Sequence, residues 1–558
     1  MLKDKIQIGT ALYALLLVLA AYYFGLFIDL TADTGKYGAI ARHILDSGDW
    51  INLKIHGEPY DQKPPLIFWL ATLGFELGGL HNWSYKLFSV LYSFGGFWFT
   101  YRLGKTLYTK RTGVLAALML FSSEVYFLFA MDVHTDLLLQ ANITLAIWQL
   151  AAYLKTRKTL NFVLAFTGVG LAMMSKGAIG AAIPAFALGT HLLIKRDFRQ
   201  LVHPKWLLGI LIALIVALPA FAGLYNQFGL EGLKFFFITN NVGRITGSYA
   251  GNNSDYLFYF HTILYLFLPW TFLLFFGLYH EIKSYFLKSG TNREYFTVGG
   301  IWIYFLIASI AKGKAPHYIF TLIPLFAVIV GKWLDFWLQE TDLKNIHWLF
   351  RAQYLVLALI IVFLVTLMGY GFPSNNLLYW VLLVTSLAAC FILVTSEGEL
   401  LTKLFLPSII LMATLNIYLN AQVFPETFSY QASTHASRIY NEKAAPGEPL
   451  SNYLYGQYEL FFYADTDVKQ LYSLKDFKLN PVQNSWIFTT QQGLDSIHGK
   501  YQNNIELVYP LKHQGMNKVT IKFLNPETRE QALKPMYLLK LNPKIEQSET
   551  QNSPNKKP

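Results

Sequence analysis

Long apolar runs recur along most of this chain, and they constrain its fold more than any other feature. A helix satisfies its own backbone hydrogen bonds in lipid and needs about 20 apolar residues to cross a bilayer. By this measure the sequence predicts about thirteen membrane-spanning helices. They lie near residues 6–28, 84–104, 112–130, 137–154, 161–175, 177–194, 206–224, 256–278, 296–311, 316–334, 351–369, 377–395 and 402–420. The shorter apolar segment 66–80, which contains Glu76, is predicted to lie at the membrane interface.

The composition agrees with a polytopic α-helical membrane protein. Of the 558 residues, 54% are hydrophobic and only 14% are charged, which is too apolar for a soluble domain of this size. The net charge of +11 is scattered between apolar runs instead of gathered on one polar face, so no nucleic-acid partner is expected. The single cysteine, Cys390, lies inside an apolar run, which excludes an intrachain disulfide and a cysteine metal cluster.

Basic residues set the predicted orientation. When the spans are threaded alternately from a cytoplasmic N-terminus, most Lys- and Arg-rich loops fall on the cytoplasmic side, as the positive-inside rule expects. These residues are Arg102, Lys105, Lys110, Arg111, Lys155, Arg157, Lys158, Lys195, Arg196, Arg199, Lys205, Lys283, Lys288, Arg293, Lys332, Lys344 and Arg351. An odd number of spans then places the C-terminal part outside the cytoplasm.

The composition changes after Leu419, where apolar runs shorten and Asn, Gln, Tyr and Lys become frequent. We expect a membrane domain over residues 1–424, a small extracytoplasmic α/β domain over 425–545, and a disordered polar tail over 546–558. Strand-like runs occur at 450–455, 468–472, 485–490, 505–509, 518–523 and 535–541, and helical pieces at 457–463 and 494–500.

Ionisable residues also occur on the opposite side, where the positive-inside rule disfavours lysine and arginine. Five outer loops carry them next to span ends: Asp33, Lys36 and Lys63; Asp132, His134 and Asp136; Lys176; Arg244; and Lys312, Lys314 and His317. A charge at a low-dielectric boundary is costly unless it is paired, so such groups are candidates for function. Lysine and arginine suit a phosphate held close to the hydrocarbon, and carboxylates suit a general base.

The first outer loop, residues 29–83, contains the most informative stretch. Asp33, Lys36 and Tyr37 lie on neighbouring faces of a short helix if that segment is helical. The step Ser47-Gly48-Asp49-Trp50 is predicted to be a turn, because glycine allows backbone conformations that other residues avoid. Gln62-Lys63-Pro64-Pro65 ends the stretch, and its two prolines keep Lys63 out of a helix.

This loop resembles the signature of the GT-C glycosyltransferases that use polyprenyl-phosphate sugars, a superfamily that includes protein mannosyltransferases and the lipid A aminoarabinose transferase. Its acidic residue, basic residue and Tyr, its SGDW-type turn and its Lys-Pro pair are the matching features. Thr135-Asp136, Ser175-Lys176-Gly177 and Pro316-His317-Tyr318 are similar to further motifs of the superfamily. The looser resemblance extends over roughly the first 335 residues.

The resemblance and the residue chemistry together give each candidate a functional role. For each of the main candidates a simpler structural role is the alternative. Asp33 is the expected base, or else an ordinary helix-start residue paired with Lys36. Lys63 is an expected phosphate ligand, or a lysine that reaches the interface. Asp136 is a second catalytic candidate, or a helix cap. We expect donor phosphate binding by Lys36, Lys63, Lys176 and Arg244, and substrate binding by Tyr37, Gln62, Lys314, His317 and Tyr318.

The zinc site that the resemblance implies for the aminoarabinose transferase is not matched here. Gln62 stands where that enzyme has a Glu, and a neutral amide is a poor zinc ligand. The histidines expected in the outer loop over 225–255 are missing, and His261 falls in the next span. The Asp132-Val133-His134-Thr135-Asp136 run could bind a divalent cation, but three candidates in one loop are weak evidence. We therefore assign no metal ligands and predict no cofactor, and leave another divalent metal as an open alternative to the unmatched zinc site.

The sequence thus predicts an inverting glycosyltransferase of a bacterial inner membrane. The resemblance implies a polyprenyl-phosphate-linked donor and transfer on the outer face, to a lipid A-like lipid or to a protein. Two other classes remain open. A transporter or flippase for lipid-linked glycans would place polar residues and broken helices near the midplane instead of in outer loops. A non-catalytic envelope assembly protein would tolerate loss of Asp33.

Overall fold

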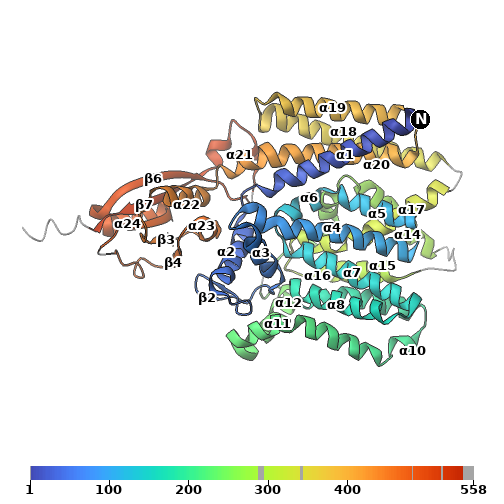
Figure 1. Ribbon diagram of the computed structural model, residues 1–558, viewed down its shortest axis with the longest axis horizontal. Coiled ribbons are helices and arrows are strands. Elements are labelled where there is room, and N and C mark those ends of the chain that lie inside the picture. Colours follow the sequence, from blue (N-terminus) through green and yellow to red (C-terminus); the bar gives the residue numbers. More distant parts are fainter. Residues whose placement is uncertain are drawn as a thin grey trace, which may run out of the picture.

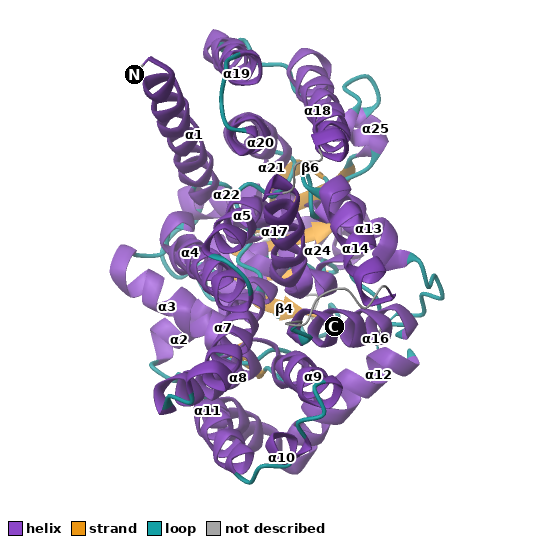
Figure 2. Ribbon diagram, turned by 90° about the vertical axis from the view of Figure 1, so that its right-hand side faces the viewer, coloured by secondary structure: helices purple, strands orange, loops and turns teal. Residues whose placement is uncertain are grey.

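The computed structural model describes residues 2–249, 251–286, 294–339, 343–480, 482–516 and 519–543. A bundle of helices forms the larger part, and a sheet domain extends from one end of it (Figure 1). Figure 2 looks along the long axis from the helical end and shows the strands behind the bundle. The helical membrane domain and the small C-terminal α/β domain agree with the predicted fold class.

The helices of the bundle follow the apolar runs. Their bounds are α1 Leu2–Leu26, α4 Asn82–Leu107, α5 Lys110–Phe121, α6 Glu124–Met131, α7 Thr135–Thr156, α8 Thr159–Lys176, α9 Ile179–Ile194, α10 Phe198–Leu201, α11 Lys205–Lys234, η1 Phe235–Thr239, α12 Asn240–Thr246, α13 Phe258–Leu266, α14 Thr271–Phe286, α15 Phe296–Val298, η2 Gly299–Ile303, α16 Tyr304–Ile310, η3 Pro316–Leu322, α17 Ile323–Gln339, α18 Leu343–Thr366, η4 Leu367–Gly371, α19 Leu377–Thr395, α20 Leu400–Tyr418 and η5 Leu419–Val423.

Every predicted span contains helix, but several are broken. Within the described ranges, eight helices are long and apolar enough to cross a membrane, or nine if α5 and α6 form one span. The α5–α6 pair bends by 58°, and Ser122 at the break accepts a 3.0 Å hydrogen bond from the Trp270 indole. The number of spans therefore stays a prediction.

The first outer loop folds into two helices and a hairpin between the bundle and the sheet domain (Figure 1). Helix α2 spans Ala32–Ser47 and is followed by its C-cap Gly48, whose φ of 70° is left-handed, with a bend at Trp50 in the predicted 47–50 step. Strands β1 (Lys54–Ile55) and β2 (Glu58–Pro59) pair antiparallel, and α3 (Leu66–Gly78) begins directly after the two prolines. Helix α3 packs against α2 and α4, which brings the loop onto the bundle.

The C-terminal domain contains a five-stranded sheet of order β4-β3-β5-β7-β6. Strand β3 pairs parallel with β4 and β5, and β7 pairs antiparallel with β5 and β6. The bounds are α21 Phe424–Phe428, α22 Ala432–Lys443, β3 Leu450–Tyr453, α23 Glu459–Tyr463, β4 Lys469–Leu471, β5 Ser485–Thr490, α24 Gln491–Tyr501, η6 Gln502–Asn504, β6 Ile505–His513, α25 Ile521–Leu524, α26 Arg529–Ala532 and β7 Lys534–Leu541.

Five of the six predicted strands and both predicted helical pieces are present. The strand predicted over 518–523 is wrong, since residues 521–524 form the short helix α25. Thr520 caps that helix by accepting a hydrogen bond from the Phe523 amide, so the local capping contact overrides the β propensity of the run. The tail predicted to be disordered, 546–558, lies outside the described residues, as do Lys288 and Arg293.

The predicted topology can be checked with fused reporters. A reporter active only in the cytoplasm is expected to be silent when fused after Tyr430 and active when fused in the loop after Thr156, because the two sites fall on opposite sides in the threading. Activity after Tyr430 would reverse the orientation and place Asp33 and Lys63 on the cytoplasmic side.

Candidate functional site

Two neighbouring cavities lie where the first outer loop meets the bundle. The first, which we call the polar cavity, has a volume of about 300 Å³. It is lined by predicted site residues from three separate outer loops: Asp33, Lys36, Tyr37, Gln62, Lys63, Arg244, Lys314, His317 and Tyr318. Tyr60 and His134 line it as well. Loops up to 285 residues apart thus supply one pocket.

The second cavity, of about 150 Å³, has a different character. Its walls include apolar side chains from α9, η1 and α16, namely Ile179, Phe236, Ile307 and Ala308. Lys176 lines this cavity and not the polar one. Five residues line both cavities and so form the junction between them: Gln62, Lys63, Arg244, Gly313 and Tyr318.

Lys63 is the least compensated cation at this junction. It lies between the β1–β2 hairpin and α3, followed by buried Pro64 and Pro65. In the described part of the chain its ammonium has no hydrogen-bond or ion-pair partner. Burial, and then the positive charge of Lys176, lower the pKa of Lys63 to about 7. An ammonium in this situation is a site that favours an anion.

Tyr318 holds the two other cations of the group. The Lys176 ammonium lies 4.6 Å from the centre of its ring, and the Arg244 guanidinium donates to its hydroxyl. Arg244 also donates to Asn240 Oδ1 at 2.8 Å, one turn earlier on α12. Cation–π and hydrogen-bond contacts of this kind fix both charges in place. Together with Lys63, they form a cationic cluster at the junction.

Asp136 lies behind this cluster and is fully buried. Lys176 Nζ contacts both of its carboxylate oxygens at 2.7 Å, and His134 Nδ1 lies 2.9 Å from Oδ2. The Asp136 backbone amide donates to the same His134 Nδ1 at 3.5 Å, so His134 caps the start of α7. Asp136 lines neither cavity. It also lies in the first turn of α7, where the helix N-terminus stabilises its charge.

Asp33 is placed differently, in the first turn of α2 on the wall of the polar cavity. Its side chain is 61% exposed, and Lys36 Nζ lies 3.9 Å from Oδ1. Tyr37, beside it, is buried, and burial followed by the charge of Asp33 raises the pKa of its phenol. Asp33 is thus open to a ligand, whereas Asp136 is enclosed.

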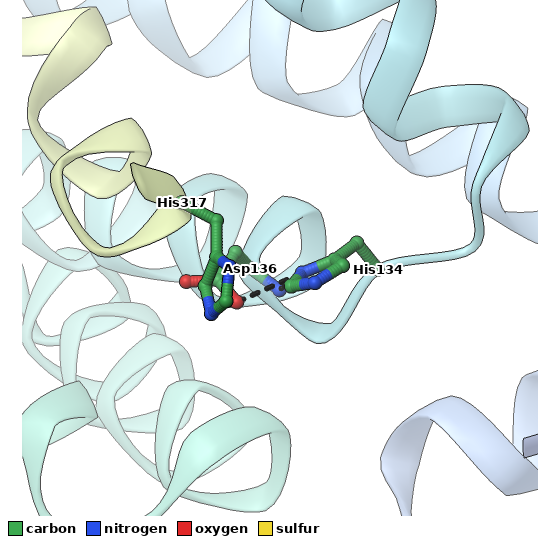
Figure 3. A group of neighbouring side chains, drawn as sticks. All are labelled: His134, Asp136 and His317. Carbon is green, nitrogen blue, oxygen red and sulfur yellow. Dashed lines mark hydrogen bonds and ion pairs between the residues drawn. The ribbon is translucent and has the colours of Figure 1, made fainter. Parts of the chain in front are cut away.

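A possible metal-ligand group comes from residues far apart in the chain. His134, Asp136 and His317 place their ligand atoms within 4.8 Å of one another (Figure 3). However, both Asp136 oxygens already contact the Lys176 ammonium, so its charge is balanced. Lys63 and Arg244 line the polar cavity beside the two histidines, and a dication would have to enter this positive surrounding. The group fits a hydrogen-bonded network better than a resident metal.

The zinc pattern implied by the resemblance does not fit either. Gln62 does lie on both cavities, but it offers an amide where a carboxylate is needed. His261 lies outside both cavities, with Nδ1 3.7 Å from Asp255 Oδ2. No step of the chemistry is therefore assigned to a metal.

The sequence assigned no specific role to two ring side chains of the polar cavity, Tyr60 and His134. Tyr60 lies two positions before Gln62, and its only sequence signal was its place in the first outer loop. His134 was visible between two aspartates, but its contact with His317, at 4.5 Å between ring centres, depends on folding.

Comparison with known proteins agrees with this geometry. Residues 62–222 match the family described as dolichyl-phosphate-mannose-protein mannosyltransferase. An uncharacterized protein of Aquifex aeolicus is 28% identical over 352 residues, which is 62% of this chain and 68% of that protein. The undecaprenyl phosphate-alpha-4-amino-4-deoxy-L-arabinose arabinosyl transferase 2 of Proteus mirabilis is 25% identical over 337 residues. That match spans 59% of each chain, so a large part of the named relative is not aligned.

The fold likeness extends further along the chain. The crystal structure of ArnT from Cupriavidus metallidurans bound to undecaprenyl phosphate superposes with a TM-score of 0.74 at 16% identity, covering 95% of this chain and 98% of that one. The apo form gives the same TM-score at 17% identity, covering 96% and 99%. The chain therefore has the fold of ArnT, and over part of its length its sequence is similar to that of transferases that use polyprenyl-phosphate-linked sugars.

Proposed function

We propose that this protein transfers a sugar from a polyprenyl-phosphate donor to a membrane lipid on the outer face of a bacterial inner membrane. The observation that carries the proposal is the cationic cluster at the junction between a polar and a largely apolar cavity. The donor has the same order of parts: a sugar, an anionic phosphate and a hydrocarbon chain. Each part then meets a surface of matching chemistry.

The phosphate is expected at the junction, against Lys63, Arg244 and Lys176. The first two line both cavities, and Lys176 reaches the second. The prenyl chain would leave past Ile179 and Phe236. The sugar would lie in the polar cavity, where Tyr37, Gln62, Lys314, His317 and Tyr318 offer hydrogen-bonding groups.

The reaction follows as a single displacement. Asp33 takes the proton of the acceptor hydroxyl, and the acceptor oxygen forms a bond to the anomeric carbon. The bond from that carbon to the phosphate oxygen breaks, and its electron pair stays on the lipid phosphate. Lys63, Lys176 and Arg244 stabilise the added negative charge. Attack opposite the leaving phosphate inverts the anomeric centre.

The contacts of Asp136 and Lys36 assign each of them a more specific role than the sequence did. Asp136, a second catalytic candidate from the sequence, is proposed to act through Lys176, which it holds with both oxygens. Lys36 lines the polar cavity only and lies beside Asp33, so we assign it to the base and not to the phosphate at the junction.

Transfer of label tests the proposal. Purified protein in liposomes receives a radiolabelled polyprenyl-phosphate sugar together with lipid A-like lipid or a protein acceptor, and the label is followed into each fraction. The undecaprenyl-linked aminoarabinose named for the relatives is the first donor to try. Appearance of label in the lipid supports the proposal, and label in protein would change the acceptor. Movement of the donor across the bilayer without transfer of label would favour a flippase. Absence of both transfer and movement would favour an assembly protein.

Metal removal should have no effect. Purified protein is expected to hold no stoichiometric zinc, and a chelator should leave transfer unchanged, because Lys176 already balances Asp136. Metal analysis of the purified protein measures its zinc content, and label transfer with and without chelator measures the effect of metal removal. Loss of transfer that one metal restores would contradict this expectation. The same experiment on His317→Ala would then show whether His134, Asp136 and His317 bind that metal.

A further inference from the structure

The C-terminal domain is in direct backbone contact with the helix that carries Asp33 and Lys36. Its helix α23 packs against α2 (Figure 1). A Cβ atom at Gly35 would lie 3.1 Å from Glu459 Cα, and one at Gly38 would lie 2.7 Å from the Phe462 ring. Two glycines one turn apart thus let α23 approach more closely than side chains would allow.

Polar contacts fix this docking. Arg42 of α2 donates to the Ala464 carbonyl at 2.6 Å. The Leu30 amide, just before α2, donates to the Tyr463 hydroxyl at 2.8 Å, and Arg438 pairs with Asp29 at 2.8 Å. The C-terminal domain therefore holds the start and the middle of the segment that contains Asp33. A displacement of this domain would move the wall of the polar cavity.

Tyr458, the residue before α23, meets Lys36 at that wall. The Lys36 ammonium lies 4.6 Å from the centre of the Tyr458 ring. Its only other partner in the described part of the chain is Asp33, at 3.9 Å, although the Lys36 side chain is 14% exposed. Burial lowers the pKa of Lys36, and the charge of Asp33 opposes that shift.

The same tyrosine also contacts the hairpin that leads to Lys63. The His56 ring lies parallel to it, with 5.6 Å between centres, and lies 3.8 Å from the Phe461 ring. His56 is at the tip of the β1–β2 hairpin with a φ of 55°. A non-glycine residue in this conformation needs support from its surroundings. Tyr458 and Phe461 supply that support from the C-terminal domain.

We propose that Tyr458 is a positioning residue of the transfer reaction, which holds the Lys36 ammonium beside Asp33 and so makes the C-terminal domain part of the active site. This inference rests on the proposed function, in which Asp33 is the base. The ring face carries the interaction, so phenylalanine should replace tyrosine and leucine should not.

The test compares Tyr458→Leu and Tyr458→Phe in the full-length protein. Tyr458→Leu is expected to lower kcat roughly tenfold, the size expected of a partly desolvated cation–π contact. Binding of undecaprenyl phosphate should be unchanged, because Lys63, Lys176 and Arg244 are intact. Tyr458→Phe should keep most of kcat. Tyr501→Leu is the matched control, since Tyr501 contacts the Lys500 ammonium at 5.0 Å on helix α24 of the same domain.

A double-mutant cycle decides whether Tyr458 acts through Lys36. If it does, Lys36→Met with Tyr458→Leu should lose no more kcat than Lys36→Met alone. Additive losses, or a Tyr458→Leu variant as active as the unchanged protein, would overturn the inference. Absence of label transfer by the unchanged protein would instead contradict the proposed function, so the two failures can be told apart.

Discussion

Asp33→Asn is expected to lower turnover by about two to four orders of magnitude, the usual contribution of a general base. Asparagine keeps the shape and much of the hydrogen bonding of aspartate but cannot accept the proton of the acceptor hydroxyl. Binding of undecaprenyl phosphate should change little, because Asp33 lines only the polar cavity. Turnover by label transfer and a binding titration on the same preparation measure the two effects.

Asp46→Asn provides a matched control. Asp46 lies near the other end of α2, is 61% exposed like Asp33, and contacts Arg42 at 3.8 Å, close to the 3.9 Å between Asp33 and Lys36. It lines neither cavity, so its substitution should leave turnover near that of the unchanged protein. Near-normal turnover of Asp33→Asn would remove the proposed base and direct attention to the His134–Asp136 pair.

Lys63→Ala is expected to weaken binding of undecaprenyl phosphate as well as turnover. A charge-assisted contact in a partly desolvated site contributes about 1.5–3 kcal/mol, or roughly 10- to 150-fold in Kd. Lys54→Ala is the control, since Lys54 lies in the same loop and lines neither cavity. Unchanged binding in Lys63→Ala would make Lys63 an ordinary interfacial lysine.

The pH dependence of binding gives a second test of Lys63. Its pKa in the free protein is lowered to about 7, and only the ammonium attracts the phosphate. Bound phosphate favours the protonated form, so binding takes up a proton and affinity falls as the pH rises above 7, by up to about tenfold per pH unit. Lys63→Arg stays charged, so its Kd should be nearly constant over the same range.

The apolar runs determined much of the fold, because backbone groups in lipid must be paired within each segment. Helix is therefore found at all predicted spans, and the alternating runs near the C-terminus form five strands. The breaks depended on packing instead: α5 and α6 separate where Ser122 meets Trp270, and hydropathy alone does not encode that contact. At 521–524 a capping threonine outweighed strand propensity.

The sequence by itself identified the residue types of the site, since charges on the unfavoured side of the membrane are costly and so stand out. Only the tertiary structure decided which of these residues face a cavity and which are enclosed. It enclosed Asp136 with Lys176 and left Asp33 open to a cavity. It brought His317 to His134 and Tyr458 to Lys36, across 183 and 422 residues of chain. Contacts over such separations follow from how helices and domains pack, which no local pattern records.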